Sequence, residues 1–153
     1  MRRNISIWIM LLMVGWLPVA QAATTPEYMA ALAVMGYGYT VKVSVNGADA
    51  GIKGGKSENR RLFNTDHEMA AMATPAIRAQ NFVLKPGDNR IVVEYAKTDQ
   101  NAGDTLEVRL DLEGYPVPVF HLQSKNKASG KVEQTFVLQQ PAPKNFKTTT
   151  INE

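Results

Sequence analysis

Cysteine is absent from the 153-residue chain, and this absence removes several kinds of chemistry. A chain without cysteine has no disulfide, no thiol nucleophile and no thiolate ligand for a metal ion. Tryptophan is scarce as well, because Trp8 and Trp16 are the only two and both lie near the start of the chain. Sugar-binding faces usually present aromatic platforms, so this distribution favours a protein partner over a carbohydrate, which stays possible.

The chain also lacks a large positive net charge when its first residues, which include Arg2 and Arg3, are not counted. The whole chain has 17 basic and 14 acidic residues, for a net charge of +3. Arg2 and Arg3 belong to the targeting segment described next, and without them the net charge falls to +1. A nearly neutral domain lacks the basic surface that nucleic acid requires, so we expect no nucleic-acid partner.

The first 22 residues have the layout of a secretory signal peptide. Arg2 and Arg3 precede an uncharged apolar run at residues 5–17, Pro18 follows, and small residues end at Ala22. The apolar run is about 13 residues long, whereas a spanning helix needs about 20. We therefore expect cleavage after Ala22, export to the periplasm or outside the cell, and no stable membrane span afterwards.

The rest of the chain is predicted to be one β-sandwich domain, residues 23–138, followed by a tail. From Tyr39 the apolar residues alternate, so that Val41, Val43 and Val45 share one face, and Asn46-Gly47 is a strong signal for a tight turn. Further extended segments are expected at residues 60–64, 79–84, 89–96, 104–114, 116–123 and 132–138. About seven short strands predict a mainly β, antiparallel sandwich of the immunoglobulin-like or jelly-roll type. Residues 139–153 are polar and contain proline, and are expected to form a flexible tail.

One or two short helices are expected in addition to the strands. Residues 24–35 form an apolar run that begins with capping-box spacing and ends at Gly36, which predicts a helix. The alternative is a flexible leader anchored by Tyr28 and Leu32. Residues 65–73 have the same capping-box spacing and predict a second helix that Pro75 ends.

Two stretches resemble a known family. Residues 45–55, VNGADAGIKGG, and residues 84–95, LKPGDNRIVVEY, resemble the non-catalytic, sugar-binding (galactose-binding-like or immunoglobulin-like) β-sandwich module of β-galactosidase- and β-glucuronidase-like enzymes. The chain departs from the pattern because Lys56 replaces an aromatic residue, a helix-like insert separates the stretches, and the strands expected before Val41 are mostly missing. The resemblance implies a β-sandwich and no catalytic residue.

Two surfaces are candidates for binding. Basic side chains crowd a glycine-rich loop, where an anion could bind, or where they could simply be solvated: Lys53, Lys56, Arg60 and Arg61. In the run from Tyr115 to Leu122, Pro116 and Pro118 cannot donate to a strand ladder, so they predict an edge strand. That edge, with Tyr115 and Phe120, is either a docking edge or one that proline protects from aggregation.

A few residues could instead form a metal site or a catalytic site. His67, Met69 and Met72 offer an imidazole and two thioethers, which suit copper(I), although methionine at this spacing is more often part of a core. His67 and His121 are the only histidines, and neither lies in a nucleophile motif.

The sequence therefore predicts an exported, non-catalytic binding or accessory module without a cofactor, whose partner is a protein of the cell envelope. The alternative is a small periplasmic copper-binding protein, and a hydrolase is the third possibility.

Overall fold

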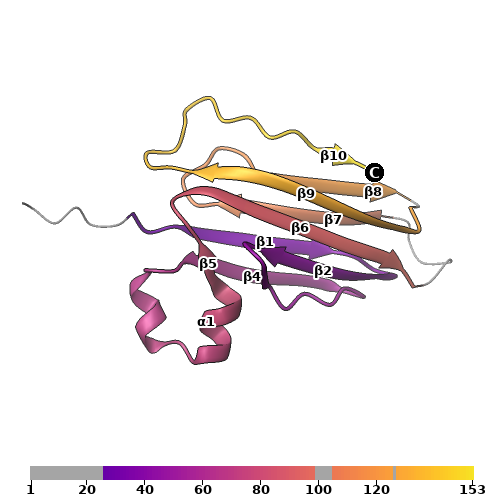
Figure 1. Ribbon diagram of the computed structural model, residues 1–153. Coiled ribbons are helices and arrows are strands. Elements are labelled where there is room, and N and C mark those ends of the chain that lie inside the picture. The colour runs from indigo at the N-terminus through magenta and orange to yellow at the C-terminus, as the bar shows by residue number, and fades with distance from the viewer. Residues whose placement is uncertain (1–25, 99–104, 126) are drawn as a thin grey trace, which may run out of the picture.

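The structure, a computed structural model, describes residues 26–98, 105–125 and 127–153, and the predicted signal peptide lies outside these ranges. The described residues form two β-sheets that stack face to face (Figure 1). This arrangement confirms the prediction of a mainly β sandwich with short helices. In this part of the chain, no helix has the length and apolar character needed to cross a membrane.

The elements have the following bounds. The strands are β1 (Met29–Met35), β2 (Tyr39–Val45), β3 (Ala48–Asp49), β4 (Ser57–Asn64), β5 (Phe82–Leu84), β6 (Gly87–Lys97), β7 (Thr105–Leu112), β8 (Phe120–Lys125), β9 (Ser129–Leu138) and β10 (Ile151–Asn152). The helices are the 3₁₀ helix η1 (Glu68–Met72) and the α-helix α1 (Pro75–Asn81).

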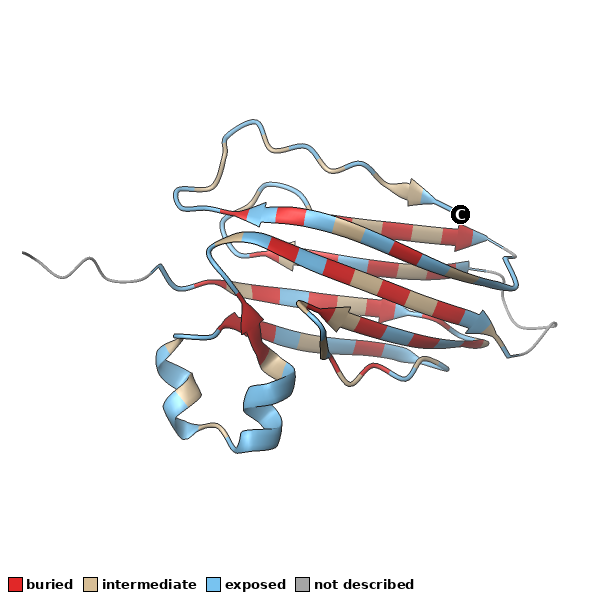
Figure 2. Cartoon of the chain, viewed as in Figure 1, coloured by how far each residue is buried: buried red, intermediate tan, exposed pale blue. Residues whose placement is uncertain are grey.

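The larger sheet has the order β10-β8-β7-β1-β4-β5, and the smaller sheet has the order β3-β2-β6-β9. Most neighbours are antiparallel, but β4 with β5 and β8 with β10 are parallel. Figure 2 shows buried and exposed residues alternating along the strands, as side chains of period two require. The buried stripes meet in one core, to which Leu32, Leu110 and Leu138 belong.

The predicted helix at residues 24–35 is wrong where the structure describes it. β1 lies in the middle of the larger sheet, between β4 and β7. Its residues Ala30, Leu32 and Val34 are buried in the core, while the side chains between them lie on the outer face. Both faces of β1 carry apolar residues, so its sequence does not show the alternation of polar and apolar residues that marks a half-buried strand. Hydrogen bonding to a strand on each side outweighs the helix preference of alanine, leucine and methionine.

The second helical prediction is partly wrong in its position. Residues 65–81 form a hoop that projects from the sandwich between β4 and β5, made of η1 and α1 (Figure 1). Thr65 caps neither helix: His67 caps η1 and Thr74 caps α1. Pro75 lies in the first turn of α1, where its missing N–H is tolerated, so it begins a helix and does not end one. This helix includes residues 79–81, which were expected to be part of a strand.

The two stretches that resemble a known module meet in space. Asn46 and Gly47 form the turn between β2 and β3 with positive φ angles of 52° and 84°. The Asn46 amide donates to Val83 O at 2.7 Å and to Asn89 Oδ1 at 2.8 Å. Asn89 is buried and also accepts from Lys85 N at 2.9 Å. Side-chain amides thus replace the backbone partners that two adjacent turns would otherwise lack.

The carboxy-terminal segment differs from the flexible tail that was expected. Residues 139–153 leave β9 in the smaller sheet and return along the sandwich to the larger sheet, where Ile151 and Asn152 pair with Leu122 and Gln123 (Figure 1). The proline-bearing edge strand was also predicted too early, because β8 begins only at Phe120. β10 covers its free edge.

Candidate binding surfaces

The four basic residues of the glycine-rich loop do not form one patch. Arg60 and Arg61 are adjacent on β4 and therefore point to opposite faces of the sheet. The Arg60 guanidinium donates to Gly51 O at 3.3 Å. Arg61 instead lines a shallow hollow of about 240 Å³ on the outer face of the larger sheet, with Ala31 and Asp111.

Lys53 and Lys56 flank a buried carboxylate. Glu58 is buried, and one of its oxygens accepts from the backbone N–H groups of Lys53 and Gly54, each at 2.9 Å. Burial alone would raise the pKa of Glu58, but these two N–H groups, with the charges of Lys56 and Arg60, hold the pKa below its ordinary value. The loop's N–H groups are therefore already used by an internal anion.

The predicted docking edge is occupied by the chain's own carboxy-terminal segment. The ring of Tyr115 packs edge-on against Phe146, with centroids 5.0 Å apart. Pro116 lies in the connection before β8, and Pro118 O accepts a hydrogen bond from the hydroxyl of Thr148. Phe120 is fully buried in the core, so it cannot contact a partner. Sequence reasoning could not anticipate this covering segment, because its contacts join distant parts of the chain.

The copper candidates lie on the hoop but face different surroundings. The His67 ring packs against Phe63 and Phe82, with centroids 4.8 and 6.4 Å apart, on the outer face of the larger sheet. Its Nδ1 accepts from Met69 N at 3.2 Å, and its Nε2 lies 3.7 Å from Glu27 Oε2. Met72 is 83% exposed. The three side chains therefore do not converge on a ready-made site.

Large apolar side chains are exposed on the hoop. No residue of η1 or α1 is buried, and Figure 2 shows the hoop almost entirely exposed. Met69, Met72 and Ile77 are exposed, and we call these three residues the hoop surface. Two hollows flank α1, one of about 460 Å³ lined by Pro75, Arg78 and Phe82 among others. The second measures about 540 Å³ and includes Lys53 in its lining.

The second histidine connects the larger sheet to the carboxy-terminal segment. His121 Nε2 lies 3.0 Å from Glu107 Oε1, and its Nδ1 lies 3.0 Å from Thr150 Oγ1. A carboxylate, an imidazole and a hydroxyl in line resemble the order of groups in a hydrolytic triad. Neither His121, Glu107 nor Thr150 lines any of the described hollows. We therefore interpret the contact as a clip that holds Thr150 to the larger sheet.

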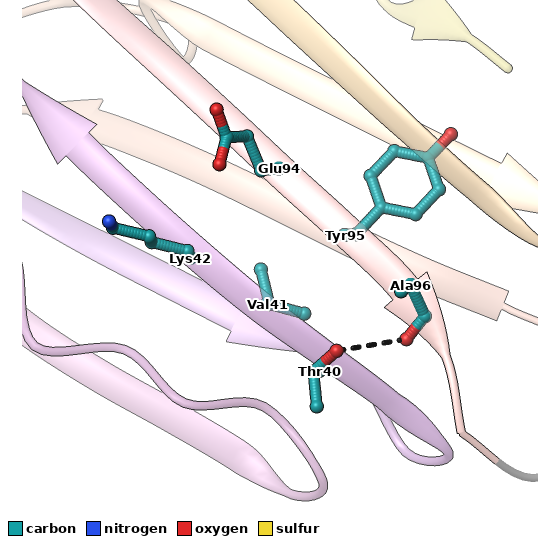
Figure 3. A pocket seen from close by; sticks show the side chains of 6 residues that line it. All are labelled: Thr40, Val41, Lys42, Glu94, Tyr95 and Ala96. Atoms are coloured by element: carbon teal, nitrogen blue, oxygen red, sulfur yellow. Dashed lines mark hydrogen bonds between the residues drawn. The ribbon is translucent and has the colours of Figure 1, made fainter.

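A hollow on the outer face of the smaller sheet was not anticipated from the sequence. It has a volume of about 270 Å³ and lies over β2 and β6. Figure 3 shows Lys42 and Glu94 projecting from these neighbouring strands. Beside them, Thr40 Oγ1 donates a hydrogen bond to Ala96 O, with 3.2 Å between the two atoms. A hydrogen bond from Lys131, at 2.7 Å, and the charge of Lys42 lower the pKa of Glu94. The charges compensate one another, as on a solvated sheet face.

Comparison with known proteins gives no relative: no family model matches the chain, and no match was found among curated proteins or solved structures. The resemblance of residues 45–55 and 84–95 to a sugar-binding module is therefore neither supported nor opposed.

Proposed function

We propose that this protein is an exported, non-catalytic binding or accessory module that acts, in the periplasm or outside the cell, on a protein partner through the hoop surface. The observation that supports this proposal is the exposure of Met69, Met72 and Ile77 on a short helical connection. The parallel strands β4 and β5 must be joined by a crossover connection, and the hoop is that connection. Joining the two strands does not require large apolar side chains that are exposed to water.

A protein partner suits the charges around the hoop better than a lipid surface. The hoop and its base carry acidic Asp66, Glu68 and Glu27 together with basic Arg78 and Arg61. A segment that binds anionic lipid is rich in lysine and arginine on its polar side. Exposed apolar side chains among charges of both signs are instead typical of a protein–protein contact, in which flexible methionine side chains adapt to the partner.

The experiment is photo-crosslinking from the hoop in the cell envelope, followed by binding measurements with the purified crosslinked protein. In the test variant, Met69, Met72 and Ile77 are each replaced by serine. The control carries Met35→Ser and Tyr37→Ser, because Met35 is 46% exposed, like Met69, and lies on β1 outside the hoop.

We expect the test variant to weaken binding about tenfold or more, since exposed apolar anchors supply much of an interface's free energy. The control should change the dissociation constant less than about twofold. Equal weakening in both variants, or recovery of the protein without a specific partner, would contradict the proposal.

Copper(I) binding is the second candidate, and one observation favours it. In a 3₁₀ helix with three residues per turn, Met69 and Met72 lie on the same side of η1. If His67 turned away from Phe63, its imidazole would join two thioethers, which are soft ligands suited to copper(I). Competition against a copper(I) chelator tests this proposal, with Met69→Leu/Met72→Leu as the variant. Binding that this variant retains would rule out the site.

A further inference from the structure

The smaller sheet has a long open edge. β9 pairs with β6 through ten residues without a register shift, from Ser129 opposite Ala96 to Leu138 opposite Gly87. Among the described strands, β6 is the only neighbour of β9. A regularly paired strand with one free side is a template for another strand.

The pairing determines which backbone groups of β9 face outward. Lys97 N donates to Ala128 O at 2.7 Å, so these residues form a hydrogen-bonded pair. Because such pairs alternate in an antiparallel ladder, the even-numbered residues of β9 bond to β6. The N–H and C=O groups of Ser129, Lys131, Glu133 and Thr135 therefore point to the open side.

The chain itself reaches this edge near both of its ends, because Glu153 contacts Lys127 just before β9, and Tyr115 contacts Val137 at the far end. The Tyr115 hydroxyl lies 3.5 Å from Val137 O and accepts from Gln139 N at 3.0 Å, which confirms that odd-numbered groups face outward. The carboxy-terminal segment is bonded to Pro118 and to β8 in the larger sheet. The backbone of residues 129–135 bonds only to β6 in the described structure. The open stretch is thus centred on Val132.

Two opposite charges lie beside this centre on the outer face. Lys131 Nζ lies 2.7 Å from Glu94 Oε1, and Arg90 holds Glu133 through two contacts of 2.5 Å. Each charge on β9 is therefore positioned by a partner on β6. Ser129, Lys131, Glu133 and Thr135 are exposed.

We propose that residues 129–135 pair antiparallel with the same residues of a second copy of this chain, with the two Val132 residues facing each other at a two-fold axis. This proposal concerns a surface separate from the hoop surface and does not rest on the proposed function. In this register Lys131 lies opposite Glu133 of the second copy, and Ser129 lies opposite Thr135. Residues 129, 131, 133 and 135 of one copy then lie opposite residues 135, 133, 131 and 129 of the other, and all of them have outward backbone groups. Each of these four pairs can form two backbone hydrogen bonds, which gives about eight in total.

The charges select this register and favour a second copy as the occupant. In the neighbouring register on one side, Lys131 would lie opposite Lys131 of the second copy, and in the one on the other side Glu133 would lie opposite Glu133. Like charges directly opposite each other destabilise a strand pair. In the proposed register, four side chains follow one another across the axis. They are Arg90 and Glu133 of one copy, then Lys131 and Glu94 of the other. This row of four charges alternates in sign across the axis, which makes the edge complementary to itself.

The first test measures the oligomeric state of the protein, purified after export, by sedimentation over a wide concentration range. We expect a reversible dimer that Lys131→Glu weakens about tenfold or more, because it places glutamate opposite Glu133 at two points. Reversing all four charges of the row, with Lys131→Glu, Glu133→Lys, Glu94→Lys and Arg90→Glu, keeps opposite charges paired both within a copy and across the axis, and should restore the dimer. Lys42→Glu on β2 makes the same charge change away from the edge and should leave the dimer intact.

The second test identifies the register by cysteine crosslinking, which is unambiguous because the chain has no cysteine of its own. Directly opposite residues at a non-hydrogen-bonded position lie at the short end of the range of about 4.5–5.5 Å between Cβ atoms. A small shift brings them within the range of about 3.5–4.5 Å that a disulfide requires. Val132→Cys should therefore give a covalent dimer under mild oxidation. Thr135→Cys should not, because residue 135 lies opposite Ser129 of the second copy.

Several outcomes would overturn the proposal. One is a monomer at every concentration, and another is a dimer that Lys131→Glu does not change. Faster crosslinking at residue 135 than at residue 132 would exclude this register. If Lys42→Glu dissociated the dimer as strongly as Lys131→Glu, the dimer would depend on net charge, and the specific pairing would be wrong. A dimer that reversal of all four charges fails to restore would also contradict the pairing of residues 131 and 133.

Discussion

The Thr150 hydroxyl lies 3.0 Å from Nδ1 of His121, and this contact attaches the carboxy-terminal segment to β8 immediately before β10 begins. His121 is positioned in turn by Glu107 on β7, 3.0 Å away. The contact therefore joins three segments that are far apart in the sequence. Because β10 has only two residues, side chains contribute much of what holds this segment in place.

Replacing Thr150 by valine should loosen the segment without unfolding the sandwich. Valine keeps the shape of threonine but loses the hydroxyl, so one hydrogen bond worth about 0.5–1.5 kcal/mol disappears. We expect faster proteolysis within residues 139–150, since local opening exposes the backbone. Limited proteolysis with mass spectrometry measures this, and Thr149→Val at an exposed neighbouring position is the control. Equal cleavage rates in both variants would show that the contact does not hold the segment.

Replacing Tyr39 by phenylalanine should stabilise the protein. The Tyr39 hydroxyl is buried in the core and has no hydrogen-bond partner in the described structure. An unsatisfied buried polar group costs about 1–3 kcal/mol, so removing it should raise the free energy of unfolding by about 1 kcal/mol. Urea denaturation measures the change. Tyr95→Phe is the contrast, because the Tyr95 hydroxyl donates to Glu153 Oε2 at 3.1 Å and its loss should destabilise.

Glu58 should make stability depend on pH in the acidic range. Its folded-state pKa is held below the ordinary value, so the carboxylate contributes stability above the unfolded-state pKa of about 4.3. That contribution is lost as the pH falls through the folded-state pKa. Glu58→Gln should cost about 1–2 kcal/mol at neutral pH, because a charged acceptor of two N–H groups becomes neutral.

Urea midpoints at pH 7 and pH 3 test this expectation for Glu58. The difference between wild type and Glu58→Gln should shrink at the lower pH. Glu113→Gln, at an exposed position, should show no such convergence. A gap that stays constant with pH would mean that the charge of Glu58 is unimportant.

Gly54 should tolerate alanine much less well than Gly55. Both have positive φ angles, 80° and 75°, which cost a residue with a side chain about 1–3 kcal/mol. A Cβ at Gly54 would also lie 2.3 Å from Tyr39 O, whereas a Cβ at Gly55 meets nothing within 4 Å. We therefore expect Gly54→Ala to cost about 2 kcal/mol more than Gly55→Ala in thermal or urea unfolding. Equal costs would contradict the close approach of this loop to β2.

The sequence predicts the sandwich well where polar and apolar residues alternate, as they do from Tyr39 to Val45 and from Thr105 to Leu112. It fails at β1, because alanine and methionine on the outer face make a strand resemble an apolar helix. It also fails for residues 139–153, whose polar composition conceals a return to β8. Both errors involve pairing between distant segments, which local patterns cannot express.

The candidate surfaces were predictable only in part. The residues His67, Met69 and Met72 were identified, but their exposure on a projecting hoop depends on where β4 and β5 pair. The open side of β9 was not predicted, since strand order within a sheet decides which strand lies at an edge. The sequence around Lys131 and Glu133 does not specify the register with β6, which brings these side chains to Glu94 and Arg90.

The path of the last residues has a practical consequence for how the molecule can be tethered. Residues 139–153 bring Glu153 to the end of the sandwich opposite the hoop (Figure 1). A linker fused after Glu153 would therefore fix the protein to a sensor surface with Met69, Met72 and Ile77 turned toward the solution. Attachment near Pro26 would instead place the solid support close to the hoop, since Glu27 contacts Glu68 and His67 there.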